Sequence, residues 1–211
     1  MYIWFFVCVL GVIAVMPVHF LSVEHLKLQD RYGEEKGTSI GKIFGVVSGW
    51  GFFLFWFGIW ISPQARFAVP ILLNLSIVIP SIDFSIPLLH LIIFAPFFIV
   101  GALFGIKGVK EATLQTAETH RPEKIVTTGV YSTVRHPQYF GGLLAHVGIS
   151  FLFSALFSLV STALMVLIIY IISWKEEKEL SREFGREYEV YKKEVPMLMP
   201  RFISKKKTRV K

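Results

Sequence analysis

The chain has 211 residues, of which 54% are hydrophobic and 18% are charged, and its formal net charge is +7. Soluble globular domains are typically about 45–50% apolar and about 25% charged, so this composition excludes an ordinary soluble enzyme. The single cysteine, Cys8, excludes an intrachain disulfide and a cysteine-based metal site, and the histidines show no metal-binding spacing. We therefore expect one all-α integral membrane domain without a metal centre.

The N-terminal part begins with two apolar segments that are long enough to span a membrane. Residues 2–21 form the first predicted span and residues 43–61 the second. The polar residues between them, 23–42, predict a short interfacial helix and a loop. The second span is rich in tryptophan, and its indoles are expected to face lipid or the interface: Trp50, Trp56 and Trp60.

A third span follows an ambiguous segment. Residues 67–85 are apolar but contain Pro70 and Pro80, which favours an interfacial or re-entrant segment over a full span. Residues 87–106 form the third predicted span, and His90 is expected near its outer, interfacial end.

A long uncharged stretch predicts a helical hairpin. Residues 140–173 contain no Asp, Glu, Lys or Arg. As one helix they would extend about 50 Å, well beyond a hydrocarbon core of about 30 Å. A reversal at residues 153–156 divides them into two arms of about 25 Å each, which would be the fourth and fifth spans. His146 on the first arm is expected to pack or form hydrogen bonds in the core.

An amphipathic helix is predicted to continue the last span over residues 175–195. Five apolar side chains recur on one helical face: Leu180, Phe184, Tyr188, Tyr191 and Val195. The opposite face carries charged side chains: Glu179, Arg182, Arg186, Glu187 and Lys193.

The positive residues favour five spans over six. If residues 67–85 do not cross, only Arg66 of the 22 Lys and Arg residues lies opposite to the others. The positive-inside rule then predicts an outer N-terminus and a cytoplasmic C-terminus. The chain divides into N-terminal helices (1–108), a hairpin with a cap (109–203) and a basic tail (204–211). The tail is expected to meet anionic lipid rather than nucleic acid.

Two polar clusters at the ends of the hairpin are the candidate site. Arg135, His136 and Pro137 predict an anion-binding corner, and Glu176 and Glu177 predict an acidic corner that attracts a cation. Because the hairpin folds back, both corners should meet at one membrane interface. The competing interpretation is an interfacial anchor, a helix cap and a solvated acidic face.

Tyrosines lie at the same predicted membrane level and could cover an aromatic ring or a sulfonium: Tyr131, Tyr139, Tyr188 and Tyr191. Taken together with the two charged corners, they predict a cytoplasm-facing pocket for a zwitterionic, nucleotide-like ligand.

Three motifs carry a family resemblance. Residues 129–139 read Gly-Val-Tyr-Ser-Thr-Val-Arg-His-Pro-Gln-Tyr, residues 176–177 are Glu-Glu, and residues 184–196 read Phe-Gly-Arg-Glu-Tyr-Glu-Val-Tyr-Lys-Lys-Glu-Val-Pro. In combination they resemble the isoprenylcysteine carboxyl methyltransferase family and the related phospholipid methyltransferases, over about residues 123–202.

The resemblance implies an integral membrane methyltransferase that uses S-adenosylmethionine and holds it under a cytoplasmic cap. It implies cofactor contacts at Gln115, Lys124, Ile125, Val126, Tyr131, His136, Pro137, Gln138, Tyr139, Glu176 and Tyr188. Arg135, His136 and Glu177 are the residues expected to assist the reaction, by holding the cofactor's polar end or by taking a proton. The chain departs from the carboxyl methyltransferases at Glu123, where a histidine is frequent, and at Ile172, where an arginine stands.

The implied reaction is methyl transfer to a lipidic or isoprenylated acceptor, with carboxyl O-methylation favoured. The acceptor is expected to enter from the bilayer between the hairpin and residues 87–106. Phospholipid N-methylation, an NADPH-dependent membrane reductase of the sterol-reductase type, and a non-catalytic membrane scaffold are the alternatives.

Overall fold

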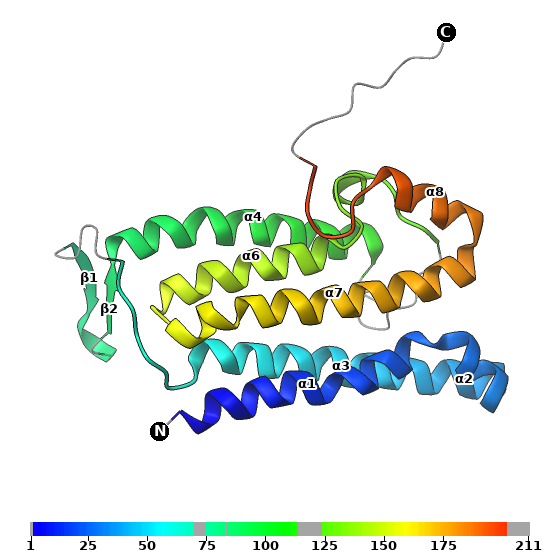
Figure 1. The fold of residues 1–211 in the computed structure, drawn as a ribbon, viewed down its shortest axis with the longest axis horizontal. Helices are drawn as coiled ribbons and strands as arrows, with labels where there is room; N and C mark the ends of the chain where they lie inside the picture. The colour runs from blue at the N-terminus through cyan, green and yellow to red at the C-terminus, as the bar shows by residue number, and fades with distance from the viewer. Residues whose placement is uncertain (1, 70–74, 83, 114–123, 202–211) are drawn as a thin grey trace, which may run out of the picture.

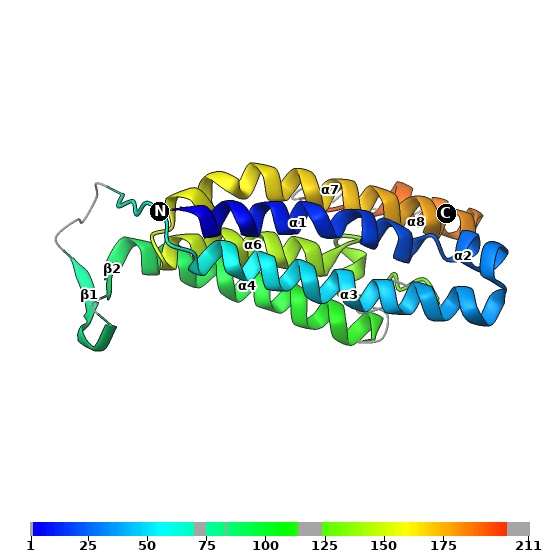
Figure 2. The same ribbon diagram turned by 90° about the horizontal axis from the view of Figure 1, so that it is seen from below.

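The computed structural model describes residues 2–69, 75–82, 84–113 and 124–201. Five long helices lie side by side along one axis: α1 (Ile3–Val23), α3 (Glu34–Ile61), α4 (Leu88–Ala112), α6 (Pro137–Leu152) and α7 (Leu156–Phe184) (Figures 1 and 2). Shorter helices, α2 (His25–Tyr32) and α8 (Arg186–Glu194), lie at one end of the bundle. The predicted all-α membrane fold is confirmed.

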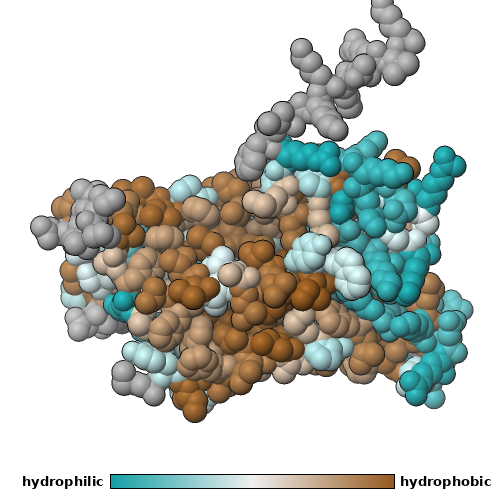
Figure 3. Space-filling model, in the orientation of Figure 1, coloured by the Kyte–Doolittle hydropathy of each residue, from teal (hydrophilic) through white to brown (hydrophobic). Residues whose placement is uncertain are grey.

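The outer surface of the bundle is apolar along most of its length. Helices α1, α3, α4 and α7 are each long and apolar enough to cross a membrane. Helix α6 has 16 residues and therefore extends about 24 Å. Figure 3 shows hydrophobic side chains over the middle of the molecule and hydrophilic ones gathered at the end that carries α8. A bundle with an apolar belt and one strongly polar end is the arrangement expected in a bilayer.

The predicted hairpin is confirmed, and its reversal falls at the predicted residues. Helix α6 ends at Leu152 and α7 begins at Leu156. Ser154 adopts a positive φ of 51°, and the Ala155 amide donates to the Ser150 carbonyl oxygen at 2.8 Å. The turn is also tied to the segment after α3, because the Phe67 amide donates to the Ser154 carbonyl oxygen at 3.0 Å.

The structure corrects the loop predicted after the short helix and bears out the absence of a span in the described part of residues 67–85. The loop expected within residues 23–42 is replaced by Gly33 alone (φ 83°), after which α3 begins at Glu34. The segment 67–85 contains no spanning helix among its described residues. It forms instead an antiparallel hairpin of β1 (Ser76–Ile79) and β2 (Phe84–Pro87) around the 3-10 turn η1 (Pro80–Ile82).

The cap differs from the single amphipathic helix that was predicted. Gly185, with φ 55°, separates α7 from α8, because the left-handed region favours glycine. The predicted apolar face nevertheless forms one buried cluster of Tyr188, Tyr191 and Val195, against which Leu180 and Phe184 pack. On the predicted charged face Glu179 is an exception, since it is only 7% exposed.

Trp56 is wrongly predicted in the same way, and two further side chains are less exposed than an interfacial position suggests. Trp56 is buried rather than lipid-facing, Trp60 is partly buried, and His90 is fully buried. The His90 ring lies 3.0 Å from the Ser154 hydroxyl and 3.1 Å from the Phe151 carbonyl oxygen, so it joins α4 to the hairpin turn. Trp50, by contrast, is 64% exposed as predicted.

Glycines allow α4 and α6 to approach closely. A Cβ atom added at Gly101 would lie 2.7 Å from the Gly141 carbonyl oxygen, and one added at Gly141 would lie 2.5 Å from the Gly101 carbonyl oxygen. Such contacts with backbone atoms cannot be relieved by turning a side chain. One turn further along α4, a Cβ atom at Gly105 would meet no atom within 4 Å.

This difference predicts opposite results for two neighbouring alanine substitutions. Gly101→Ala is expected to destabilise the protein by about 1–3 kcal/mol, because the added methyl group overpacks the contact between the helices. Gly105→Ala should be neutral, or slightly stabilising through helix propensity. Thermal unfolding of the purified variants in one detergent measures both. Equal melting temperatures for the two variants would contradict the packing described here.

Candidate functional site

The two predicted corners meet at the polar end of the hairpin, but they bind each other. Arg135 Nε lies 2.6 Å from Glu177 Oε1, and an Arg135 terminal nitrogen donates to Glu177 Oε2 at 3.0 Å. Both side chains are more than 90% buried. The second terminal nitrogen of Arg135 donates to the carbonyl oxygens of Lys192 and Val195. The guanidinium therefore neutralises Glu177 and fastens the cap to the hairpin.

His136 lies between the two adjacent glutamates. Its Nε2 atom is 3.2 Å from Glu177 Oε1, and its Nδ1 atom is 3.4 Å from Glu176 Oε2. The Tyr139 hydroxyl donates to Glu176 Oε1 at 2.5 Å, and its ring stacks on His136 at 5.6 Å between centroids. Helix α1 adds His19, whose Nε2 atom is 3.2 Å from Glu176 Oε1. Glu176 is thus surrounded by groups that stabilise a carboxylate.

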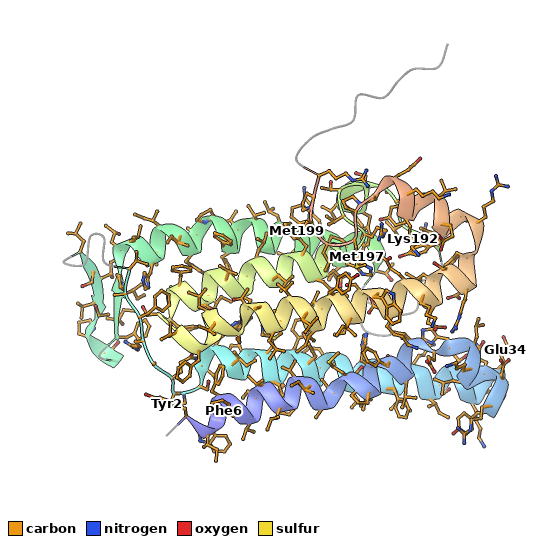
Figure 4. All side chains as sticks on the ribbon, viewed as in Figure 1. Tyr2, Phe6, Glu34, Lys192, Met197 and Met199 are labelled. Atoms are coloured by element: carbon orange, nitrogen blue, oxygen red, sulfur yellow. The ribbon has the colours of Figure 1, made fainter. Side chains whose placement is uncertain are left out.

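The segment after α8 folds back over the start of α6. The Arg135 amide donates to the Pro196 carbonyl oxygen at 2.9 Å, and the His136 amide donates to the Met197 carbonyl oxygen at 3.1 Å. Figure 4 shows Met197 and Lys192 at the same end of the bundle, opposite to Tyr2. These backbone bonds fix the Arg135–His136 segment beneath the cap.

Four tyrosines line the site: Tyr139, described above, Tyr131, and both Tyr188 and Tyr191 of α8. Tyr131, in the 3-10 turn η2 (Gly129–Ser132), accepts a hydrogen bond from Gln138 at 3.4 Å, and its carbonyl oxygen accepts one from the Tyr191 hydroxyl at 2.6 Å. Burial raises the pKa of Tyr131 to about 12. Burial, followed by the Glu177 charge, also raises the pKa of Tyr188. These phenols therefore remain neutral donors at physiological pH.

A cavity of about 220 Å³ lies between α1, α3, the hairpin and the cap. The half of the cavity beneath the cap is polar. Charged groups, histidines and tyrosines line its wall: His19, His25, Lys124, Tyr131, Arg135, His136, Gln138, Tyr139, Glu176, Glu179, Glu183, Tyr188 and Tyr191. The other half, which lies farther from the cap and is called the inner half below, is formed by Val15, Met16, Ser48, Gly49, Phe52, Phe53, Trp56, Gly142 and Ile172. The cavity therefore joins a polar ligand site to an apolar one.

Ten of the predicted cofactor contacts lie in this wall: Lys124, Ile125, Val126, Tyr131, His136, Pro137, Gln138, Tyr139, Glu176 and Tyr188. Arg135 also lines it, whereas Glu177 does not belong to its wall. Gln115 and Glu123 lie outside the described residues. Their predicted roles are untested by the geometry.

The site also contains residues that sequence patterns did not identify. His19, His25 and the tryptophan Trp56 come from the N-terminal helices, and Glu179 comes from the predicted exposed face. The only available signal was an ionisable side chain within an apolar span, which His19 provides.

The access route expected between the hairpin and residues 87–106 is closed. Helix α4 packs against α6 through Gly101 and Gly141, and Ala112 is its contribution to the described cavity wall. The apolar half is bounded by α1, α3 and the hairpin, and α1 and α3 supply most of its residues. Phe53 on α3 is part of the wall and 64% exposed, so this side faces the bilayer.

Comparison with known proteins finds one family whose model matches this chain. It is described as phospholipid methyltransferase and matches residues 90–187. These residues extend from α4 through the hairpin to the start of α8. No solved structure matches the chain at a significant level.

Three curated proteins align with about half of the chain. Methanethiol S-methyltransferase 2 of Bradyrhizobium diazoefficiens is 32% identical over 108 residues, which are 50% of this chain. Methanethiol S-methyltransferase of Crocosphaera subtropica is 35% identical over 106 residues, or 49% of the chain. Protein-S-isoprenylcysteine O-methyltransferase of Schizosaccharomyces pombe is 35% identical over 101 residues, or 44% of the chain. Each alignment covers 40% of the relative's own length.

Proposed function

We propose that this chain, whose residues 90–187 match the phospholipid methyltransferase family, transfers a methyl group from S-adenosylmethionine to an acceptor that reaches the site from the bilayer. The observation that carries the proposal is a single cavity with a polar half under the cap and an apolar half within the membrane domain. A soluble cofactor and an apolar acceptor could meet there without the acceptor leaving the membrane.

The residues of the polar half suit the proposed cofactor. A sulfonium and an amino group are cations, and the wall offers the carboxylates of Glu176, Glu179 and Glu183. Tyrosine rings can stack on an adenine or lie against a sulfonium. Lys124 is the cation of this wall that is exposed, and we assign it to the cofactor's carboxylate.

Bound S-adenosylmethionine supplies an electrophilic methyl group: the acceptor's lone pair bonds to carbon, and the carbon–sulfur pair stays on sulfur, leaving S-adenosylhomocysteine. The protein's own contribution is positioning and exclusion of water. Glu176, held by Tyr139 and two histidines, orients the cationic end. The exposed Glu183 carboxylate is placed to relay to water a proton that a thiol or amine acceptor releases.

Arg135, His136 and Glu177 act in this proposal as positioning residues. Both ring nitrogens of His136 face carboxylate oxygens, so the ring has no nitrogen turned towards an acceptor from which it could take a proton. Glu177 is engaged by Arg135 and lies behind the wall. The positive-inside rule supports a cytoplasmic position for this end of the bundle, where the cofactor would be available.

The proposal is tested with the purified protein in lipid nanodiscs. S-adenosylhomocysteine should raise its melting temperature, whereas NADPH should not, because mass action stabilises only the state that binds the ligand. Stabilisation by NADPH alone would favour the reductase alternative. Transfer of a labelled methyl group into lipid extracts and into added thiols, carboxylates and amines identifies the acceptor chemistry. Labelling that survives in the double variant His136→Ala/Glu176→Ala would contradict the assigned site.

A further inference from the structure

The inner end of the cavity is closed at one level by all four surrounding helices. The deepest wall residue is Val15 on α1, Trp56 on α3, Gly142 on α6 and Ile172 on α7. Trp56 and Ile172 also belong to the buried core that continues beyond this level. Behind them Ile59, Met165 and Ile169 are at most 1% exposed. The cavity therefore ends at a packed floor instead of continuing along the bundle.

Trp56 is the largest part of this floor, and Gly142 makes room for it. A Cβ atom added at Gly142 would lie 2.9 Å from the outer edge of the Trp56 ring. The indole is 4% exposed, and its N–H donates to His146 Nδ1 at 2.8 Å. The ring therefore has a fixed direction across the space between α3 and α6.

His146 holds that indole within a fully buried polar network. Trp60 donates to the same Nδ1 atom at 2.8 Å, and because indole nitrogen is only a donor, Nδ1 must be the unprotonated nitrogen. His146 Nε2 then carries the hydrogen and donates to the Ser158 carbonyl oxygen at 3.0 Å. Ser158 and Ser150 hydroxyls are bonded at 2.7 Å. Moving the Trp56 indole would break a bond in a dry interior, where unpaired polar groups are costly.

The floor lies close to the polar half. Val15 precedes His19 by four positions, and Ile172 precedes Glu176 by four, which corresponds to about 6 Å along a helix axis. An acyl tail that spans one leaflet needs about 15 Å. Among the residues that the structure describes, the inner wall carries no charged side chain, so a carboxylate acceptor would have no cationic partner there.

We infer that Trp56, oriented by His146, is a specificity-determining residue that limits the acceptor to a short, uncharged apolar group such as a small thiol. This inference rests on the proposed methyl transfer and narrows its acceptor class. A prenyl or acyl tail directed along the bundle would meet the indole.

The test measures methyl transfer against acceptor length. Wild-type protein in nanodiscs receives labelled S-adenosylmethionine and alkanethiols from methanethiol to dodecanethiol, with carboxylates and amines of matched length as parallel series. Trp56→Ala removes the floor. Trp56→Leu removes less side-chain volume and is used if the alanine variant does not fold. Trp60→Ala is the matched control, because it deletes an indole bonded to the same His146 atom but absent from the cavity wall.

The inference expects a wild-type rate that falls steeply beyond short thiols. In Trp56→Ala the ratio of the rate with long thiols to the rate with short thiols should rise at least about tenfold. Trp60→Ala should keep the wild-type dependence of rate on thiol length. Equal rates of wild-type protein with short and long acceptors, an unchanged profile in both Trp56 variants, or the same shift in Trp60→Ala would overturn it. If wild-type protein labels none of the three acceptor series, the proposed function itself is overturned.

Discussion

Arg135→Ala is expected to destabilise the protein by about 3–5 kcal/mol and to abolish cofactor binding. The substitution leaves Glu177 as a buried carboxylate without its bidentate partner, which is the costly way to break a buried ion pair. It also removes two hydrogen bonds to the backbone of the cap. Thermal unfolding and S-adenosylhomocysteine binding of the purified variant in detergent measure the two effects.

Arg182→Ala is the matched control for this result. Arg182 is also ion-paired, to Glu179 at 2.7 Å, but its side chain is 44% exposed. The Arg182 side chain lies largely in solvent, and Glu179 keeps Lys175 Nζ at 3.8 Å, so the loss should be only about 0–1 kcal/mol and this variant should melt close to wild type. If Arg135→Ala were no less stable than Arg182→Ala, the fastening of the cap by Arg135 would be refuted.

Glu176→Gln is expected to weaken S-adenosylhomocysteine binding by about 10- to 150-fold while leaving the fold intact. The change removes the charge but keeps the shape, and the Tyr139 hydroxyl can still donate to the amide oxygen. The range corresponds to about 1.5–3 kcal/mol, typical of a hydrogen bond to a charged group. Isothermal titration measures the affinity, and the melting temperature without ligand reports on the fold.

The neighbouring residue supplies the contrast. Glu177→Gln should act mainly on stability, because this carboxylate pairs with Arg135 and lies outside the cavity wall. Glu189→Gln changes an exposed carboxylate on α8 and should alter neither quantity. Equal losses of affinity in Glu176→Gln and Glu189→Gln would remove Glu176 from the cofactor site.

Patterns within the sequence anticipated the hairpin and most of the polar site. The uncharged run of residues 140–173 is too long for one span, so it must fold back, and its two polar ends must then meet. Three motifs in combination carried the resemblance, and ten implied contacts share one cavity wall. The reversal at residues 153–156 followed from length alone.

Local patterns were less informative where contacts between residues distant in sequence determine which side chains are buried and where a helix ends. A tryptophan in an apolar span is as compatible with lipid as with the core, and Trp56 is buried in a core formed by several helices, where His146, 90 residues away, accepts its N–H. The break at Gly185 accompanies the contact of α8 with η2, where Tyr191 donates to the Tyr131 carbonyl oxygen, and the amphipathic pattern runs through Gly185 without interruption.

The sequence by itself determined the class of protein, the hairpin and the meeting of the two charged corners, because membrane thickness constrains a chain through length and charge. Only the tertiary structure decided that these corners neutralise each other, that His19 joins Glu176, and that Trp56 closes the cavity. Those outcomes depend on the rotation of each helix about its own axis, which is fixed by packing between helices distant in sequence and leaves no periodic signal in any one of them.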